Sequence, residues 1–460
     1  MSELSPLAQR TKAFIEREQL FAPGDGLYLA ISGGVDSTVL LYLLLELGYQ
    51  PQLLHFNYQL RAEASEKDAD FVQNLAKKNN LNFFLKKVDT GAELNRLKKE
   101  NTKGDKPSLQ SLARNLRYQW FTDLQQENPN SYFLTAHHLD DALETFLINF
   151  LRGTGLAGLG GIAPKRDFYR RPLLEISRQD ILEYAQEHGI SWREDASNQS
   201  NDYLRNQLRH QVMGELRALQ SGLNKRAVEN FRQLRSSYQI YHEAVQEKWQ
   251  QITQTDERGW LLVDRQKLSV WPADTQTTLL HEGLSEMGFT PEQKRQLISA
   301  KKSSLIKADQ YWALITEKQL IISPAVVENE IIISLKEGNY AIDKYWTLSL
   351  QKIKRPQSLK CTANVAYFSP DLADLQLRVR HWQEGDKFRP FGLAGKRQKL
   401  QDFFVNGGVN RLERAHAWLL IDQEDQILWV MGYRTAEDYA VRPNEQEVWR
   451  AILTFNRQAK

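Results

Sequence analysis

A turn with the sequence S-G-G-V-D-S, residues 32–37, constrains the fold of this chain more than any other feature. The apolar run at residues 27–31 predicts a buried strand before it, and the run at 38–45 predicts a buried helix after it. Glycines let a backbone pass close to a ligand, and amides at a helix N-terminus attract an anion. The turn is therefore a candidate phosphate-binding loop, formed by Ser32, Gly33, Gly34, Val35, Asp36 and Ser37.

Asp36 is the unexpected member of this loop, because a carboxylate repels phosphates unless a cation lies between them. We therefore interpret Asp36 as a ligand of Mg²⁺, or as the anchor of such a ligand. An ordinary strand–helix connection accounts for two adjacent glycines but not for the whole motif. The sequence contains no G-x-x-x-x-G-K-[ST] pattern, which excludes a Walker A loop.

The composition bounds the class of protein. A chain of 460 residues has room for about three domains. Its single cysteine, Cys361, excludes a disulfide framework and any C-x-x-C metal or redox site, and it fits a reducing cytoplasm. Residues 1–19 do not resemble a signal peptide, and no apolar run approaches about 18 residues, so we expect no membrane span.

Further strands are predicted at residues 52–58, 81–88 and 132–136, with a helix at 65–79 between them. This alternation predicts an α/β fold in which a parallel sheet carries helices on both faces. Ligands of such sheets bind outside the carboxyl ends of the strands, where the loop at 32–37 lies. The charged segment 96–106 is predicted to be a loop.

Pairs of charged residues at helical spacing give further candidates. Asp141 and Glu144 are three apart, so both carboxylates project from one helix face. Acidic residues in a first helical turn are also ordinary partners of the helix dipole. Arg114 and Arg117 share a face in the same way, which suits phosphate recognition or a solvated surface. In a later helix, Arg205 lies on one face with a second arginine four residues on.

The rest of the chain divides by pattern. Residues 216–325 are mainly helical with a short strand pair near 304–323, residues 326–362 form a linker with short strands, and residues 363–460 form a small α+β domain. Within the last domain, residues 378–414 carry nine Lys and Arg against four Asp and Glu, interleaved with aromatics. This pattern suits either an RNA surface or a solvated basic face. The candidate phosphate contacts are Arg389, Lys396, Arg397 and Lys399.

Several motifs occur in a specific order. They are the loop at 32–37, Ala113-Arg114-x-x-Arg117-Tyr118, Ala136-His137-His138-x-x-Asp141-x-x-Glu144-Thr145, Arg171-Pro172-Leu173-Leu174, Asp195-x-Ser197-Asn198, Arg205-Asn206-x-x-Arg209 and, near the end, Gly385-Asp386-x-Phe388-x-Pro390-x-Gly392. The loop resembles that of the N-type ATP pyrophosphatases. Taken together, the motifs resemble the long, three-domain form of the tRNA(Ile)-lysidine synthetases.

This resemblance implies a reaction and its participants. ATP would adenylate the C2 oxygen of the cytidine at the first anticodon position of tRNA(Ile), with a CAU anticodon, and free L-lysine would then displace AMP. Asp141 and Glu144 would bind the lysine, Arg114 and the loop the ATP, and Arg205 phosphates or the tRNA. The resemblance assigns residues 1–215 to the catalytic domain and 216–325 and 363–460 to tRNA binding. The resemblance is compatible with a homodimer and does not decide the oligomeric state.

Two other readings compete with this one. The first is another tRNA-modifying enzyme of the ATP pyrophosphatase type, although a thiolase would need cysteines near the site and Cys361 is far along the chain. The second is a non-catalytic tRNA-binding protein with a relic nucleotide site. The presence of Asp36, Asp141 and Glu144 argues against the second reading.

Overall fold

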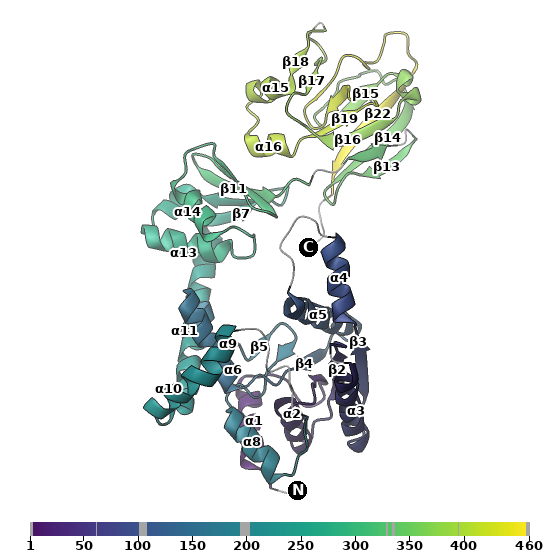
Figure 1. Ribbon diagram of the computed structural model, residues 1–460. Helices are drawn as coiled ribbons and strands as arrows, with labels where there is room; N and C mark the ends of the chain where they lie inside the picture. The colour runs from purple at the N-terminus through teal and green to yellow at the C-terminus, as the bar shows by residue number, and fades with distance from the viewer. Residues whose placement is uncertain are drawn as a thin grey trace. The chain divides into compact units, whose positions relative to one another are not determined.

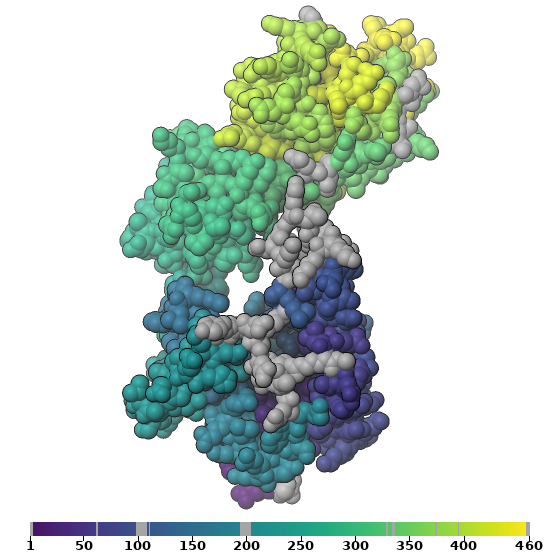
Figure 2. All heavy atoms as spheres, in the orientation of Figure 1, coloured from purple at the N-terminus to yellow at the C-terminus, as the bar shows by residue number. Residues whose placement is uncertain are grey.

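A computed structural model describes residues 3–60, 62–100, 108–193, 203–327, 330–333, 336–393 and 395–456 (Figure 1). The chain divides into two compact units, Met1–Tyr241 and His242–Lys460, which are described separately. Figure 2 shows the atoms of the first unit in purple to teal and those of the second in green to yellow. Within the described residues, no helix is both long enough and apolar enough to span a bilayer.

The first unit is built on a mostly parallel sheet, as predicted. Its strand order is β3-β2-β1-β4-β6-β5, and only the short β5 runs antiparallel to its neighbour. The strands are β1 (Gly26–Ala30), β2 (Gln52–Asn57), β3 (Phe83–Lys87), β4 (Ser131–Leu134), β5 (Lys165–Arg166) and β6 (Tyr169–Arg170).

Successive side chains of β1 point to opposite faces of the sheet. Both faces are apolar, so helices cover both of them. Leu27 and Leu29 pack into the larger core with α1, α2, α6 and α8, whereas Tyr28 packs on the other face with Phe121 of α5 and Phe133 of β4. The helices are α1 (Pro6–Arg17), α2 (Val35–Glu46), α3 (Ala62–Lys78), α4 (Thr90–Glu100), α5 (Leu109–Glu127), α6 (Leu139–Arg152), α7 (Leu156–Leu159), α8 (Arg178–Glu187), α9 (Tyr203–Gln207), a π-helix (Leu208–Val212), α10 (Met213–Leu219) and α11 (Leu223–Ile252).

The segment predicted as a loop at residues 96–106 differs from the prediction in its first part. Helix α4 continues to Glu100, and residues 101–107 lie outside the described part of the chain. The physical reason is local: Glu93 and Arg96 are three apart on α4 and form an ion pair of 2.6 Å, so the charges of this segment are compatible with a solvated helix.

The second unit holds more strand than the predicted helical pattern suggested. An antiparallel sheet of order β7-β8-β11-β10-β9 packs with three short helices. Strands β7 and β8 have only three and four residues, too short for an alternation that sequence reading can detect. The elements are β7 (Thr253–Thr255), β8 (Leu261–Asp264), α12 (Arg265–Ser269), α13 (Ala273–Gly283), α14 (Pro291–Ser299), β9 (Leu305–Lys307), β10 (Tyr311–Ile315) and β11 (Gln319–Pro324).

The last part of the chain is rich in antiparallel strands, with sheets of order β12-β16-β19-β20-β21 and β13-β14-β22-β15 and the hairpin β17-β18. This agrees with the predicted α+β class. The strands are β12 (Ile331–Ile333), β13 (Gly338–Ala341), β14 (Trp346–Lys354), β15 (Val365–Phe368), β16 (Leu377–His381), β17 (Lys387–Phe388), β18 (Gln398–Lys399), β19 (Trp418–Ile421), β20 (Ile427–Val430), β21 (Arg434–Thr435) and β22 (Glu447–Phe455); the helices are a 3₁₀-helix (Pro370–Asp374), α15 (Leu400–Asn406) and α16 (Arg411–Ala415).

Gly283 at the end of α13 provides a test of packing in the second unit. A Cβ at this position would lie 2.4 Å from ring atoms of Trp249, which is itself buried and cannot easily move. We expect Gly283→Ala to destabilise the unit by about 1–3 kcal/mol through overpacking. Helical Gly214 has open space around its Cβ position, so Gly214→Ala should instead be neutral or stabilising by up to about 1 kcal/mol. Thermal melting of both variants checks this, and equal melting temperatures would contradict it.

Candidate active site

The loop at residues 32–37 is shaped by its own hydrogen bonds. Gly33 has a φ of +92°, a conformation that favours glycine. The Gly34 amide donates to the Ser32 hydroxyl at 3.3 Å, while the hydroxyls of Ser37 and Thr38 donate to the Gly34 carbonyl at 3.1 and 2.9 Å. Among the described residues, no side chain caps the N-terminus of α2 at Gly34. The first turn of α2 is therefore free to receive an anion, as predicted from the sequence.

Asp36 carries a charge that the protein only partly balances. Its Oδ2 lies 3.7 Å from Nη1 of Arg178 and its Oδ1 lies 3.9 Å from Nε2 of His138. Within the described residues, the buried Oδ1 has no hydrogen-bond partner. Burial raises the pKa of Asp36, and the charge of Asp141 raises it further, against the opposing effects of His138 and Arg178. An unpartnered carboxylate oxygen in this setting fits a cation ligand.

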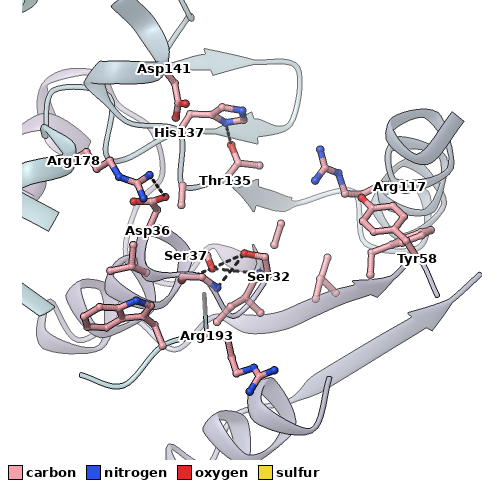
Figure 3. Close-up of a pocket in the computed structure, with 18 of the residues that line it drawn as sticks. Ser32, Asp36, Ser37, Tyr58, Arg117, Thr135, His137, Asp141, Arg178 and Arg193 are labelled. Carbon is pink, nitrogen blue, oxygen red and sulfur yellow. Dashed lines mark hydrogen bonds and ion pairs between the residues drawn. The ribbon is translucent and has the colours of Figure 1, made fainter. Parts of the chain in front are cut away.

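The loop opens onto a cavity of about 550 Å³ with two chemically different ends. Figure 3 shows Asp36 and Arg178 at one end and Tyr58 and Arg117 at the other. Asp141 also lines the cavity, Ser32 and Thr135 lie between the two ends, and much of the remaining lining is apolar (Figure 3). A flat base fits the apolar part while its phosphates reach the loop. The apolar residues that line the cavity are Ala30, Ile31, Val35, Leu54, Phe56, Phe121, Ala136, Leu182 and Trp192.

The predicted carboxylate pair on α6 is held by arginines. Glu144 is only 1% exposed, and Arg209 donates to it from Nε at 2.6 Å and from Nη2 at 3.0 Å. Nη2 of Arg209 also lies 3.4 Å from Asp141. Arg205 contacts Glu144 at 3.4 Å and donates to Thr145 at 3.1 Å. The two carboxylates do share one face, and a guanidinium already occupies it.

The ionisation of this pair follows from its partners. Burial opposes ionisation of Asp141, but the charges of His138 and His137 and the amide of His138, 3.1 Å away, outweigh it and lower the pKa. Arg209 has its pKa raised by Glu144 and Asp141 against the cost of burial. The group is thus an ion-paired cluster in which Arg209 contacts both carboxylates and Asp141 faces the cavity.

One end of the cavity is held in place by two residues that the sequence did not reveal. Arg178 is the first residue of α8, next to the capping box of Ser177 and Asp180. Buried Asp140 accepts the Arg178 amide at 3.0 Å and also forms an ion pair with Arg217. The capping box is visible in the sequence, but it does not reveal which cavity the helix faces.

Of Arg114 and Arg117, only the second lines the cavity. Arg117 lines the cavity, whereas Arg114 is exposed and donates to the Tyr118 hydroxyl at 3.2 Å. The role predicted for Arg114 in nucleotide binding stays a prediction. The motif at residues 195–198 lies outside the described residues.

The basic residues predicted to contact RNA differ in their surroundings. Arg389 forms an ion pair of 2.8 Å with Asp438, whereas Lys396, Arg397 and Lys399 are exposed and form no ion pair within the described part of the chain. Lys399 of β18 pairs directly with Lys387 of β17. Like charges directly opposite each other destabilise a hairpin, so an anion bound there would stabilise it.

Comparisons with known proteins cover most of the chain. A family model described as "PP-loop domain" matches residues 4–216, and one described as "TilS substrate C-terminal domain" matches residues 377–452. The chain is 30% identical over 456 residues to a tRNA(Ile)-lysidine synthase of Parabacteroides distasonis, covering 95% of this chain and 97% of that protein. It is 29% identical over 449 residues to that of Bacteroides thetaiotaomicron, covering 96% and 98%, and 26% identical over 464 residues to that of Clostridium acetobutylicum, covering 94% and 96%.

The two acidic residues at the ends of α2 should respond to pH in opposite ways. Asp36 has a pKa raised above its ordinary 3.8, so its charge destabilises the fold increasingly as pH rises above that value. Asp36→Asn should therefore raise the melting temperature at neutral pH, with the gain disappearing below about pH 3.9.

Glu46 provides the matched control. Burial raises the pKa of Glu46, but hydrogen bonds from Ser5 and from Tyr184, the latter at 2.7 Å, outweigh burial and lower it below 4.5. Its stabilisation is present above the ordinary value and lost as pH falls through the lowered one, so Glu46→Gln should lower the melting temperature at neutral pH. Melting curves from acid to neutral pH test both variants, and shifts of the same sign would contradict the analysis.

Proposed function

The chain belongs to the tRNA(Ile)-lysidine synthase family, and we propose that its cavity performs the two steps of lysidine formation with the residues described above. The family activity is the ATP-dependent ligation of lysine to the cytidine at the first anticodon position of tRNA(Ile). The observation that supports the proposal most is that the phosphate-binding loop and Asp141 line one cavity. Activation by ATP and capture of an amine therefore have their groups side by side.

ATP is proposed to bind with its base on the apolar lining and its phosphates on the loop. The Ser32 hydroxyl and the first amides of α2 are the available donors, and Ser37, 3.2 Å from Ser32, supports the loop through its bond to the Gly34 carbonyl. Arg178 would balance negative charge at the phosphate end, and Arg114 is proposed to contact the nucleotide. In the first step the C2 oxygen of cytidine attacks the α-phosphorus of ATP, and pyrophosphate leaves.

Mg²⁺ is the metal proposed for this site. The orphaned Oδ1 of Asp36 and the raised pKa of that group fit a cation, and Asp36 would hold it together with phosphate oxygens of ATP. Mg²⁺, when bound, neutralises phosphate charge and stabilises the pyrophosphate that leaves. Asp36 itself keeps this cation at the end of the cavity where Arg178 lies.

Free lysine is proposed to bind at Asp141 and Glu144. Its ε-ammonium has the same charge as the guanidinium of Arg209, so lysine would exchange with that arginine. The amine has a free pKa near 10.4 and must lose a proton before it attacks. A neighbouring carboxylate can accept that proton in the second step, in which the amine nitrogen bonds to C2 and AMP departs with the oxygen.

The remaining parts of the proposal concern the rest of the chain. We propose that residues 1–215 form the catalytic domain, that residues 216–325 and 363–460 bind tRNA, and that residues 326–362 link them. We further propose that the substrate tRNA has a CAU anticodon, and that the protein works in the cytoplasm as a homodimer. The hairpin charges of Lys396, Arg397 and Lys399 support phosphate contacts in the last region. Arg205 is proposed to take part in tRNA binding once it leaves Glu144.

One experiment tests the central proposal. The protein is incubated with bulk tRNA, ATP, Mg²⁺ and labelled lysine, and the labelled nucleotide is then identified after digestion. Label on the first anticodon cytidine of tRNA(Ile), with one AMP released per lysine, supports the proposal. Label on another nucleotide would indicate a different modification, and tRNA binding without label would indicate a relic site. Asp36→Ala should abolish AMP release while retaining the fold.

The carboxylate pair gives a second test. Asp141→Asn and Glu144→Gln each remove a charge that the lysine ammonium would use, at a cost of about 1.5–3 kcal/mol. We expect KM for lysine to rise about 10- to 100-fold while KM for ATP changes less than about twofold. Glu183→Gln, an exposed carboxylate on α8, is the matched control. Equal losses for both substrates would argue against a lysine site.

The basic hairpin gives a third test. Replacing Arg389, Lys396, Arg397 and Lys399 by alanine should weaken tRNA binding and reduce the slope of log K against log salt by roughly 2–4 units. Because Arg389 is already paired with Asp438, most of the change should come from the other three.

Affinities for tRNA at several salt concentrations, beside the affinity for ATP, provide the measurement. Alanine replacements of the exposed, ion-paired Lys12 and Lys67, which lie outside the proposed tRNA-binding regions, are the control. If the variant with all four replacements kept the salt slope of the wild type, the hairpin would be an ordinary solvated surface.

A further inference from the structure

A groove in the second unit carries positive charges and indole rings to which the proposed function assigns no task. It has a volume of about 820 Å³ and lies where strands β9 and β10 meet helix α16. Lys307 lies on β9, Trp312 on β10, Arg411 and Arg414 on α16, and Trp382 directly follows β16. None of these residues belongs to the basic hairpin of β17 and β18, so the groove is a separate surface.

The two walls of the groove are packed against each other. Leu412 of α16 is fully buried in one apolar cluster with Trp260 and with Leu314 of β10. A hydrogen bond adds to this contact, because the Ser323 hydroxyl of β11 lies 2.9 Å from Nε2 of His416, the residue after α16. The side chains on both walls therefore face each other in a fixed arrangement.

The charges along the groove are not balanced. Arg411 and Lys307 are exposed and Arg414 is half-buried, and none of the three forms an ion pair within the described residues. Against them stand Glu330, which is already paired with an arginine of β16, and the exposed Glu384. The groove therefore has a surplus of positive charge and attracts an anion.

The two arginines of α16 are placed to bind one phosphate together. Arg411 and Arg414 are three residues apart, so their side chains leave the helix on the same side. The Nε of Arg414 donates to the carbonyl of Val409 at 2.8 Å, which fixes the orientation of its guanidinium. Guanidiniums held side by side present several N–H donors in set directions, and a phosphate accepts them.

The indole rings add flat surfaces beside these charges. Trp312 and Trp382 both line the groove and are both partly exposed. The Lys307 ammonium lies 3.9 Å from the ring centroid of Trp312, and the ring of Trp382 is oriented by an edge contact with Phe404 at 5.9 Å. A ligand that is both anionic and flat matches this lining. A nucleotide with an unpaired base is such a ligand, whereas a base inside a duplex has both faces covered.

We propose that this groove binds a nucleotide of the substrate tRNA whose base is unpaired, with its phosphate on Arg411 and Arg414 and its base against Trp382. The inference rests on the proposed function, because it takes tRNA as the substrate. The single-stranded 3′ end and the loops of tRNA can supply such a nucleotide. A contact of this kind makes the choice of tRNA depend on more than the anticodon.

The test uses the full chain and a short, fluorescently labelled single strand of oligoadenylate, with an RNA duplex as the competitor. ATP and Mg²⁺ are present throughout, so that the cavity of the first unit is occupied. Affinity is measured at several salt concentrations for the wild type, Arg411→Gln and Trp382→Leu. Arg166→Gln is the matched control, because Arg166 lies on β5 of the first unit and its side chain is 79% exposed.

The two variants should differ in kind. Arg411→Gln should reduce the slope of log K against log salt by roughly 0.7, the value for one phosphate of a single strand. Trp382→Leu should weaken binding about 5- to 100-fold through the loss of base stacking and should leave the slope unchanged. The Arg166→Gln control should stay within about twofold of the wild type, because an exposed charge far from the ligand is screened. The duplex should compete poorly.

Several results would overturn the site. An unchanged affinity and slope in Arg411→Gln would show that the groove binds no phosphate. A duplex that competes as well as the single strand, or full binding by Trp382→Leu, would show that no unpaired base enters the groove. Arg411→Gln and the duplex decide the matter even where Trp382→Leu does not fold, since Arg411 is exposed and the duplex needs no variant.

Two forms of tRNA(Ile), one intact and one without its single-stranded 3′ end, identify the source of the nucleotide. Loss of affinity in Arg411→Gln for the intact form alone supports the site and assigns it to the 3′ end, and loss for both forms supports it and assigns it to a loop. Loss for neither overturns the proposal. A wild type that ligates lysine to tRNA but does not bind the single strand overturns this site alone, whereas one that binds the single strand and labels no tRNA overturns the proposed function.

Discussion

The candidate active site depends on the compensation of buried carboxylates on one helix. Helix α6 carries Asp140, Asp141 and Glu144 within two turns, and each is met by an arginine from a later segment. Arg217 of α10 pairs with Asp140, and Arg209 of the π-helix pairs with the other two. Glu144 is 1% exposed, so removing its arginine partner would leave a buried carboxylate without a counter-charge. The segment that closes this side of the site is therefore held by ion pairs as well as by its buried apolar residues Leu208 and Met213.

Asp36 shows the opposite situation on the facing helix. Its neighbours are at 3.7 and 3.9 Å, one of its oxygens has no partner in the described residues, and burial raises its pKa. Two kinds of acidic site thus border one cavity. The carboxylates on α6 are already balanced by the protein, whereas Asp36 is balanced only when a cation arrives. This contrast suits a site that must take up a metal with ATP but exchange an organic cation.

Features set by neighbouring residues were predictable from the sequence, and features set by distant contacts were not. The β1–loop–α2 turn and the shared face of Asp141 and Glu144 follow from local periodicity, and the parallel sheet follows from the alternation of strands and helices. No local pattern indicates that Arg209, sixty-five residues after Glu144, donates to it, because that contact depends on the fold of everything between. Arg178 escaped prediction for the same reason. Strands β7 and β8 were missed because they are too short to alternate visibly.

The guanidinium on the α6 carboxylates has a consequence for amino-acid selection. Arg209 makes two hydrogen bonds to Glu144, so the geometry of this carboxylate can accept a guanidinium. If lysine binds there as proposed, this part of the site does not reject free arginine. Discrimination then falls to reactivity: a guanidinium keeps its proton at any physiological pH and cannot attack, whereas an amine can be deprotonated. Free arginine would occupy the site as a competitor and never become a substrate.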